Sequence, residues 1–184
     1  MNKHLIPFIL VLLCTTFSSL RSQSQTYFQY TIDGVEYKAI DEVFNSVGMY
    51  AKDLDSGKKI GKYISVSNYG VTGYAYTTSV TVYYRLTQEF QAQNFVLDED
   101  YTYLKKIPVG FIEVTKITGK EYDETYKCEK GSTGYIRITK VDDKVVEGEF
   151  EAELVLQNST ERKKIKISKG AFRFPIENLQ LFEY

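Results

Sequence analysis

The feature that most constrains the fold is an alternation of apolar and acidic side chains between Val145 and Leu156. Successive side chains on a β-strand point to opposite faces of the sheet, so this segment would have one apolar and one acidic face. A helix would distribute the carboxylates around its circumference, so the pattern predicts a strand. The apolar positions are Val146, Phe150, Ala152, Leu154 and Leu156, and the acidic positions are Glu147, Glu149, Glu151 and Glu153.

Two shorter alternating segments flank this strand and predict a three-stranded antiparallel meander. One covers residues 134–141 and the other covers residues 163–168. The acidic face would then lie between Arg137 on one side and Lys164 and Lys166 on the other. Opposite charges that face each other across strands contribute roughly 0.2–1 kcal/mol per pair. We therefore expect a solvated, charge-paired sheet face rather than a dedicated ion-binding ladder.

The motifs of this meander also carry a resemblance. Gly-x-Ile-x-Ile-Thr begins at Gly134, Val-x-Gly-x-Phe at Val146, and Ile-x-Ile-x-x-Gly-x-Phe at Ile165. Together with the opening Tyr-Thr-Ile-Asp-Gly that begins at Tyr30, they resemble a family of uncharacterised secreted β-proteins of the Bacteroidota. The resemblance implies a β-fold and export, and it brings no activity and no catalytic residue.

Asp33-Gly34 is a strong signal for a two-residue type I′ turn, and it predicts an opening hairpin over residues 26–39. The rest of the chain alternates short β-like segments with turns, and we expect a last short strand over residues 176–184. We therefore predict an all-β fold of about eight to ten antiparallel strands, arranged as a β-sandwich. The alternative is a lipocalin-like flattened β-barrel, which would hold a cavity.

Residues 1–24 have the pattern of a secretory signal peptide, and residues 25–184 would form a single β-domain. Lys3 provides a basic start, Leu5 to Phe17 is apolar but too short to span a bilayer, and small polar residues follow. We expect export through the Sec pathway to the periplasm or the extracellular space, and no integral membrane protein. A lipid anchor at Cys14 is the alternative, although Leu13 is large for the residue that precedes a lipid-modified cysteine.

The charge of the mature chain argues against nucleic-acid binding. Removal of residues 1–24 takes Lys3 and Arg21 from 23 basic residues and none of the 24 acidic ones, which leaves a formal net charge of −3. Nucleic-acid binding needs a basic surface patch, and the charges here are interspersed.

Histidine is absent from residues 25–184, because His4 is the single histidine of the chain. No Ser-His-Asp or Cys-His catalytic arrangement and no histidine zinc site can form without it. Cys128 is the only cysteine outside the predicted signal peptide, so an intrachain disulfide cannot form. Nearby lysines would make it reactive if it were exposed, but we expect a small buried β-filler. We therefore predict no enzyme activity, no cofactor and no metal site.

Tyrosines are the best candidates for binding residues, and we select Tyr74, Tyr76, Tyr83 and Tyr84. Such rings offer flat amphipathic surface to a ligand, although tyrosine is also an ordinary half-buried strand residue. Asp53-x-Asp55 resembles the start of a calcium loop. The twelfth position of that loop would be Ile64 instead of a bidentate glutamate, so we expect a polar hairpin turn there.

The sequence is compatible with three functions. The first is a secreted or envelope-associated, non-enzymatic module that binds an unknown protein or glycan partner. The second is a lipocalin-like carrier of a small apolar ligand. The third, a remote alternative, is a carboxylate-dependent glycoside hydrolase, which needs two acids about 5–9.5 Å apart.

Overall fold

The computed structural model describes residues 26–40, 44–53, 55–68, 75–98, 108–119, 123–129, 131–179 and 181. The predicted signal peptide and Cys14 lie outside these residues, which are almost entirely β-structure and contain no α-helix. The strands are β1 (Tyr27–Ile32), β2 (Val35–Ile40), β3 (Asn45–Lys52), β4 (Lys59–Ser67), β5 (Tyr76–Arg85), β6 (Gln93–Leu97), β7 (Val109–Lys116), β8 (Glu124–Lys127), β9 (Gly134–Val141), β10 (Val145–Leu156) and β11 (Lys164–Pro175), followed by the short 3-10 helix η2 (Ile176–Leu179).

All eleven described strands belong to one sheet, in the order β2-β1-β11-β10-β9-β6-β7-β5-β4-β3. The short strand β8 pairs with both β10 and β7. The pairing β10-β9-β6-β7-β8-β10 therefore closes into a ring of five strands, which makes a β-barrel. Additional strands extend the sheet from β10 through β11, β1 and β2, and from β7 through β5, β4 and β3.

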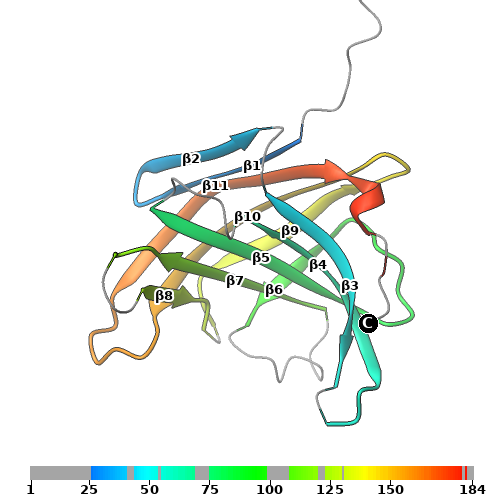
Figure 1. Ribbon diagram of the computed structural model, residues 1–184, viewed down its shortest axis with the longest axis horizontal. Coiled ribbons are helices and arrows are strands. Elements are labelled where there is room, and N and C mark those ends of the chain that lie inside the picture. The colour runs from blue at the N-terminus through cyan, green and yellow to red at the C-terminus, as the bar shows by residue number, and fades with distance from the viewer. Residues whose placement is uncertain are drawn as a thin grey trace, which may run out of the picture.

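The two extensions face each other across a shared hydrophobic core (Figure 1). β1, β10 and β11 contribute Phe28, Phe150 and Phe172 to this core, and β4 and β5 contribute Ile64 and Val82 from the opposite side. Each of these side chains is at most 2% exposed. Rings on β1, β10 and β11 contact one another with centroid distances between 5.2 and 6.4 Å. The sheet is thus folded around an interior that side chains occupy.

The predicted all-β fold is confirmed, and the two best local predictions agree with the structure. The opening hairpin joins β1 to β2 in continuous register, and Asp33 and Gly34 have the positive φ angles of a type I′ turn, 47° and 91°. β9, β10 and β11 form the predicted meander. β11 is longer than expected and runs to Pro175.

The arrangement of the strands differs from the expectation in two ways. A sandwich of two separate sheets is not confirmed, because every described strand belongs to the same sheet. The sheet is also not purely antiparallel, since β6 and β7 pair in parallel through Val96↔Val109 and Leu97↔Gly110. Two parallel strands cannot be joined by a hairpin turn, so the sequence contains no turn signal that would predict this pairing.

Residues 176–179 form a 3-10 helix instead of the start of a last strand, so that prediction is wrong for the described residues. The amide of Ile176 donates to the carbonyl of Lys144, and Leu179 is buried against β3. A Cβ atom at Gly48 of β3 would lie 3.0 Å from the Cα atom of Leu179. Close packing over β3 thus takes the place of strand pairing.

Candidate functional site

A hollow on the outer side of the sheet lies over β6, β9 and β10, and we call it the Thr139 hollow. Its volume is about 500 Å³, within the range of about 300–1,000 Å³ that is usual for small-molecule sites. It is open to solvent along much of its length. The lining residues are Ala92, Gln93, Asn94, Arg137, Ile138, Thr139 and Glu149.

A β-bulge creates this hollow. Lys140 pairs with Glu147 and Ile138 pairs with Gly148, so Thr139 has no opposite residue on β10. The pairing of β9 with β6 also stops at Ile138. A bulge re-aims the side chain that it carries and bends the strand. The outer surface is therefore indented at the point where Thr139 lies exposed.

The polar groups of the Thr139 hollow are held in place by the sheet. Arg137 Nε and Nη2 both donate to Glu149 Oε1, at 3.1 and 2.6 Å. Asn94 is the register partner of Arg137 on β6. Gln88 Nε2 donates to Gln93 Oε1 at 2.8 Å, while Gln93 Nε2 is buried and has no hydrogen-bond partner among the described residues. Amide, guanidinium, carboxylate and hydroxyl groups thus converge on one surface.

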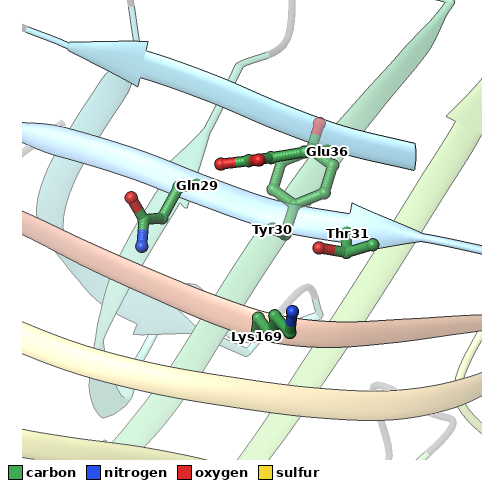
Figure 2. A pocket seen from close by; sticks show the side chains of 5 residues that line it. All are labelled: Gln29, Tyr30, Thr31, Glu36 and Lys169. Atoms are coloured by element: carbon green, nitrogen blue, oxygen red, sulfur yellow. The ribbon is translucent and has the colours of Figure 1, made fainter. Parts of the chain in front are cut away.

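A smaller hollow has a volume of about 140 Å³ and also lies at a bulge. Lys169 has a φ angle of 53°, and Lys169 and Gly170 together face Tyr30 on β1. Figure 2 shows the residues that line this Lys169 hollow, with Glu36 contributed by β2. The volume corresponds to a few water molecules at roughly 30 Å³ each, so it suits a smaller group than the Thr139 hollow.

The acidic face of β10 is paired across strands, as the sequence predicts. Lys164 Nζ lies 2.6 Å from Glu153 Oε1, and Arg137 contacts Glu149 at the same distance. A third pair joins Arg173 to Glu147 at 3.1 Å. The first two pairs are largely exposed, and exposed pairs typically contribute about 0–1 kcal/mol each.

The four predicted binding tyrosines do not form one surface. Tyr74 lies outside the described residues. Tyr76 and Tyr84 point to the core side of β5, and Tyr83 points to the other side, where its ring lies 5.4 Å from that of Tyr63. Tyr76 is half-buried, and its ring meets the edge of the Tyr37 ring at 5.8 Å.

Tyr84 is part of the core rather than of an exposed binding surface. Its side chain is fully buried, and its ring lies 5.1 Å from the rings of Phe90 and Phe95. Its hydroxyl donates to the carbonyl of Gln91 at 2.9 Å. Burial raises the pKa of Tyr84 well above the ordinary tyrosine value, because the phenolate would be poorly solvated there.

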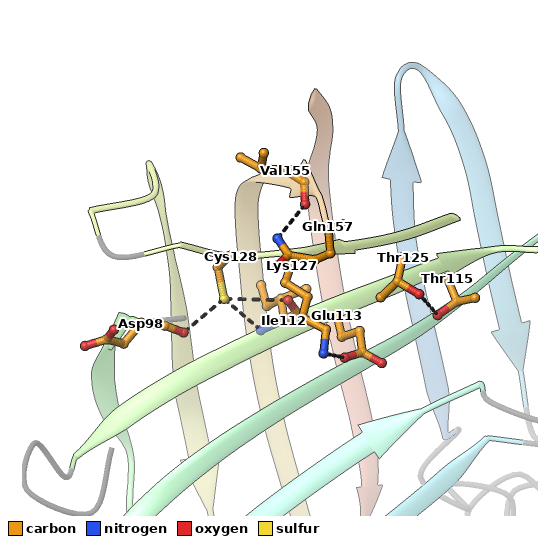
Figure 3. A network of polar contacts seen from close by, with 9 residues as sticks. All are labelled: Asp98, Ile112, Glu113, Thr115, Thr125, Lys127, Cys128, Val155 and Gln157. Atoms are coloured by element: carbon orange, nitrogen blue, oxygen red, sulfur yellow. Dashed lines mark hydrogen bonds and ion pairs between the residues drawn. The ribbon is translucent and has the colours of Figure 1, made fainter. Parts of the chain in front are cut away.

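Cys128 is a buried filler immediately after β8, as the sequence predicts (Figure 3). Its Sγ atom accepts a hydrogen bond from the amide of Ile112 at 3.2 Å and donates to the carbonyl of Asp98 at 3.3 Å. Beside it, the Lys127 ammonium lies 2.7 Å from a Glu113 carboxylate oxygen. Because the thiol is fully buried, a reagent in solution does not reach it without local opening.

The burial of two polar residues, Lys62 and Asn68, is not predicted from the sequence. Lys62 is 5% exposed, and its ammonium lies 4.8 Å from the centroid of the Phe90 ring and 3.8 Å from Glu89. Asn68 is 2% exposed, donates to the Tyr30 hydroxyl and accepts from the amide of Thr78. Alternation around Ile64 and Val66 would place both residues inward, but only their tertiary partners explain why they are buried.

The turn after β3 has the geometry of a polar hairpin. Asp53 Oδ1 accepts hydrogen bonds from the amide and the hydroxyl of Ser56, at 2.8 and 2.7 Å. These bonds lower the pKa of Asp53 and close the turn locally. Across the part of the chain that the structure describes, no group of three or more His, Cys, Asp or Glu residues is arranged to hold a metal ion.

Comparison with known proteins finds no matching family model, curated protein or solved structure. The resemblance to the secreted β-proteins of the Bacteroidota therefore stays a prediction. In the described ranges, no helix has both the length and the apolar character needed to cross a membrane.

Proposed function

We propose that the protein is an exported, non-enzymatic binding module that contacts its partner with its outer surface. The observation that carries this proposal is the occupied interior. Phe28, Phe150 and Phe172 are each at most 1% exposed, and the Phe150 ring lies within 6.4 Å of the other two rings on the core side of β1, β10 and β11. A carrier needs an empty space of ligand size in its interior, so the burial of these rings there supports a surface-binding module instead.

Sequence arguments support the other parts of the proposal. The basic start and apolar run of residues 1–17 support export. The lack of histidine after His4 leaves the common nucleophile–base arrangements without their base. The two facing halves of the sheet would form a sandwich-like body that β6 and β8 close at one side. The chain would belong to the secreted β-protein family that the meander resembles.

The Thr139 hollow is the best candidate for the binding surface. It is the larger of the two hollows described above, and its polar groups come from three adjacent strands of the rigid sheet. Groups carried on strands hold their positions better than groups on loops, which lowers the entropy lost on binding.

The carrier function is the second candidate, and the closed ring of five strands favours it, because barrels can enclose ligands. The two functions differ in where an apolar molecule would go. A surface module has no interior space for an apolar molecule, whereas a carrier binds apolar molecules stoichiometrically.

Titration of the mature protein with the apolar fluorophore N-phenyl-1-naphthylamine separates the two candidates. We expect no saturable binding, because the interior side chains leave no room for the fluorophore. Saturable binding with one fluorophore per chain would contradict the proposed function and would favour the carrier.

A further inference from the structure

We propose that the Thr139 hollow binds an uncharged oligosaccharide, an inference that rests on the proposed function and adds the chemical class of the ligand. Sugar hydroxyls both donate and accept hydrogen bonds, and their rings expose C–H surfaces. A site for them therefore needs planar donors and acceptors side by side, close to apolar or aromatic surface.

The donors and acceptors of the hollow meet this requirement. Arg137 uses Nε and Nη2 on a single oxygen of Glu149, so Arg137 Nη1 and Glu149 Oε2 take part in no hydrogen bond among the described residues. Together they present a donor and an acceptor side by side. Asn94 on β6 and Thr139 on the bulge add an amide and a hydroxyl, which can both donate and accept hydrogen bonds.

Apolar surface lies next to these polar groups. The Tyr135 ring is half-buried on the same face of β9 as Arg137, with its centroid 5.8 Å from the guanidinium carbon. Val96, two residues beyond Asn94 on β6, is 76% exposed. Ala92 lines the hollow itself. These side chains offer the flat contact that the C–H face of a sugar ring requires.

The surrounding charge selects an uncharged ligand. Arg137 is the one cation among the residues that line the hollow, and it is paired with Glu149. On the same face of β10, Glu147 and Glu153 are paired with Arg173 and Lys164. A phosphorylated, sulfated or uronic-acid ligand would therefore find no unpaired cation in the lining and would have to compete with Glu149 for Arg137. The hollow is also shallow and lacks the deep apolar slot that anchors a peptide side chain in a typical protein interface.

Binding of the mature protein to an immobilised array of neutral and acidic oligosaccharides tests the inference. We expect retention on one or more neutral glycans. Asn94→Ala and Arg137→Met should each weaken that binding by about tenfold or more, because each removes hydrogen bonds to the ligand.

Lys164→Met is the matched control for Arg137→Met. It removes an exposed ion pair of the same length, 2.6 Å, from the same face of β10 but outside the hollow. The control should bind like the unmodified protein, and the thermal unfolding temperatures of all three variants should confirm that they fold.

Three results would overturn the inference: binding to acidic glycans only, equal loss of binding in the Lys164→Met control, or no binding to any glycan of the array. None of these results contradicts a surface-binding module, which is tested separately by the apolar fluorophore. The glycan array thus tests the ligand class, and the fluorophore titration tests the proposed function.

Discussion

Gly148 shows how closely single residues determine the packing of this sheet. A Cβ atom at this position would lie 2.3 Å from Cζ of Phe172 on the neighbouring strand β11. The Phe172 ring therefore lies over the backbone of Gly148, and the acidic alternation of β10 continues on the other face. The alternation is visible in the sequence, whereas the ring that requires the glycine is visible only in the structure.

Gly148→Ala should destabilise the protein, because Phe172 must leave its rotamer or the two strands must separate. Overpacking of this kind typically costs about 1–3 kcal/mol. Urea unfolding should show a lower midpoint with an unchanged slope. Glu153→Ala, which removes an exposed ion pair on the same strand, is the control and should change the unfolding free energy by less than about 1 kcal/mol.

Buried tyrosines predict a loss of stability at alkaline pH. Burial raises the pKa of Tyr84, and burial with the nearby Glu124 carboxylate raises that of Tyr126 to about 12. An unfolded tyrosine ionises near pH 10, so folding keeps these groups protonated where the unfolded chain loses protons. Their contribution is therefore complete below about pH 10 and is lost as the pH rises toward 12.

Urea unfolding midpoints measured between pH 8 and pH 12 test this. We expect a plateau and then a decline that begins near pH 10. Tyr84→Phe should make the decline shallower, because it removes one of the groups responsible. A decline of unchanged steepness in this variant would show that Tyr84 ionises normally in the folded protein.

At the scale of elements, bulges indent the outer surface of the sheet. Thr139 interrupts the register of β9 with β10, and Lys169 interrupts the register of β11 with both of its neighbours. The Thr139 hollow and the Lys169 hollow lie at these positions. Their placement on a rigid sheet fixes the side chains that line them.

Lys169→Gly should be neutral or stabilise the protein by up to about 1 kcal/mol, because glycine adopts the φ angle of 53° without steric cost. Lys169→Val should destabilise it, since a β-branched residue at positive φ is strained. Lys166→Gly on the same strand is the control, and it should cost roughly 0.5–1 kcal/mol because this lysine is not among the residues with positive φ. Thermal unfolding of the three variants measures the order of their stabilities.

The elements that the sequence predicts are those with local signals. Asp33-Gly34 specifies its own turn, and the alternation in β10 specifies its buried face, so the hairpin and the meander are predictable. The β6–β7 parallel pair depends on segments that no hairpin connects. The Thr139 hollow depends on the register between β9 and β10, which neither strand shows alone.

The candidate site is less predictable than the fold for the same reason. Alternation with Val80 and Val82 already places Tyr84 on an inward face, and the structure confirms that position. Its neighbour Tyr83 necessarily faces the other way, so a cluster in the sequence becomes two separate environments on the strand. The hollow residues Asn94 and Arg137 are far apart in the chain and meet only as register partners.

At the scale of the whole molecule, one closed ring and its two extensions enclose a single core. Residues from β1, β4, β5, β7, β9, β10 and β11 contribute to the same buried cluster. Because side chains occupy this interior, we place the proposed recognition on the outside of the sheet. In the proposed function, the barrel is a frame that displays short polar surfaces, among them the Thr139 hollow at the bulge of β9.

The measurement that tests this account most directly is a two-dimensional ¹⁵N NMR titration of the mature protein with a pool of neutral oligosaccharides of different linkages. We expect amide shifts to change at Asn94, Arg137 and Thr139, while the core amides of Tyr84 and Phe150 stay in place. Shift changes centred on the core amides, or none around Thr139, would contradict binding at the outer surface of a filled barrel.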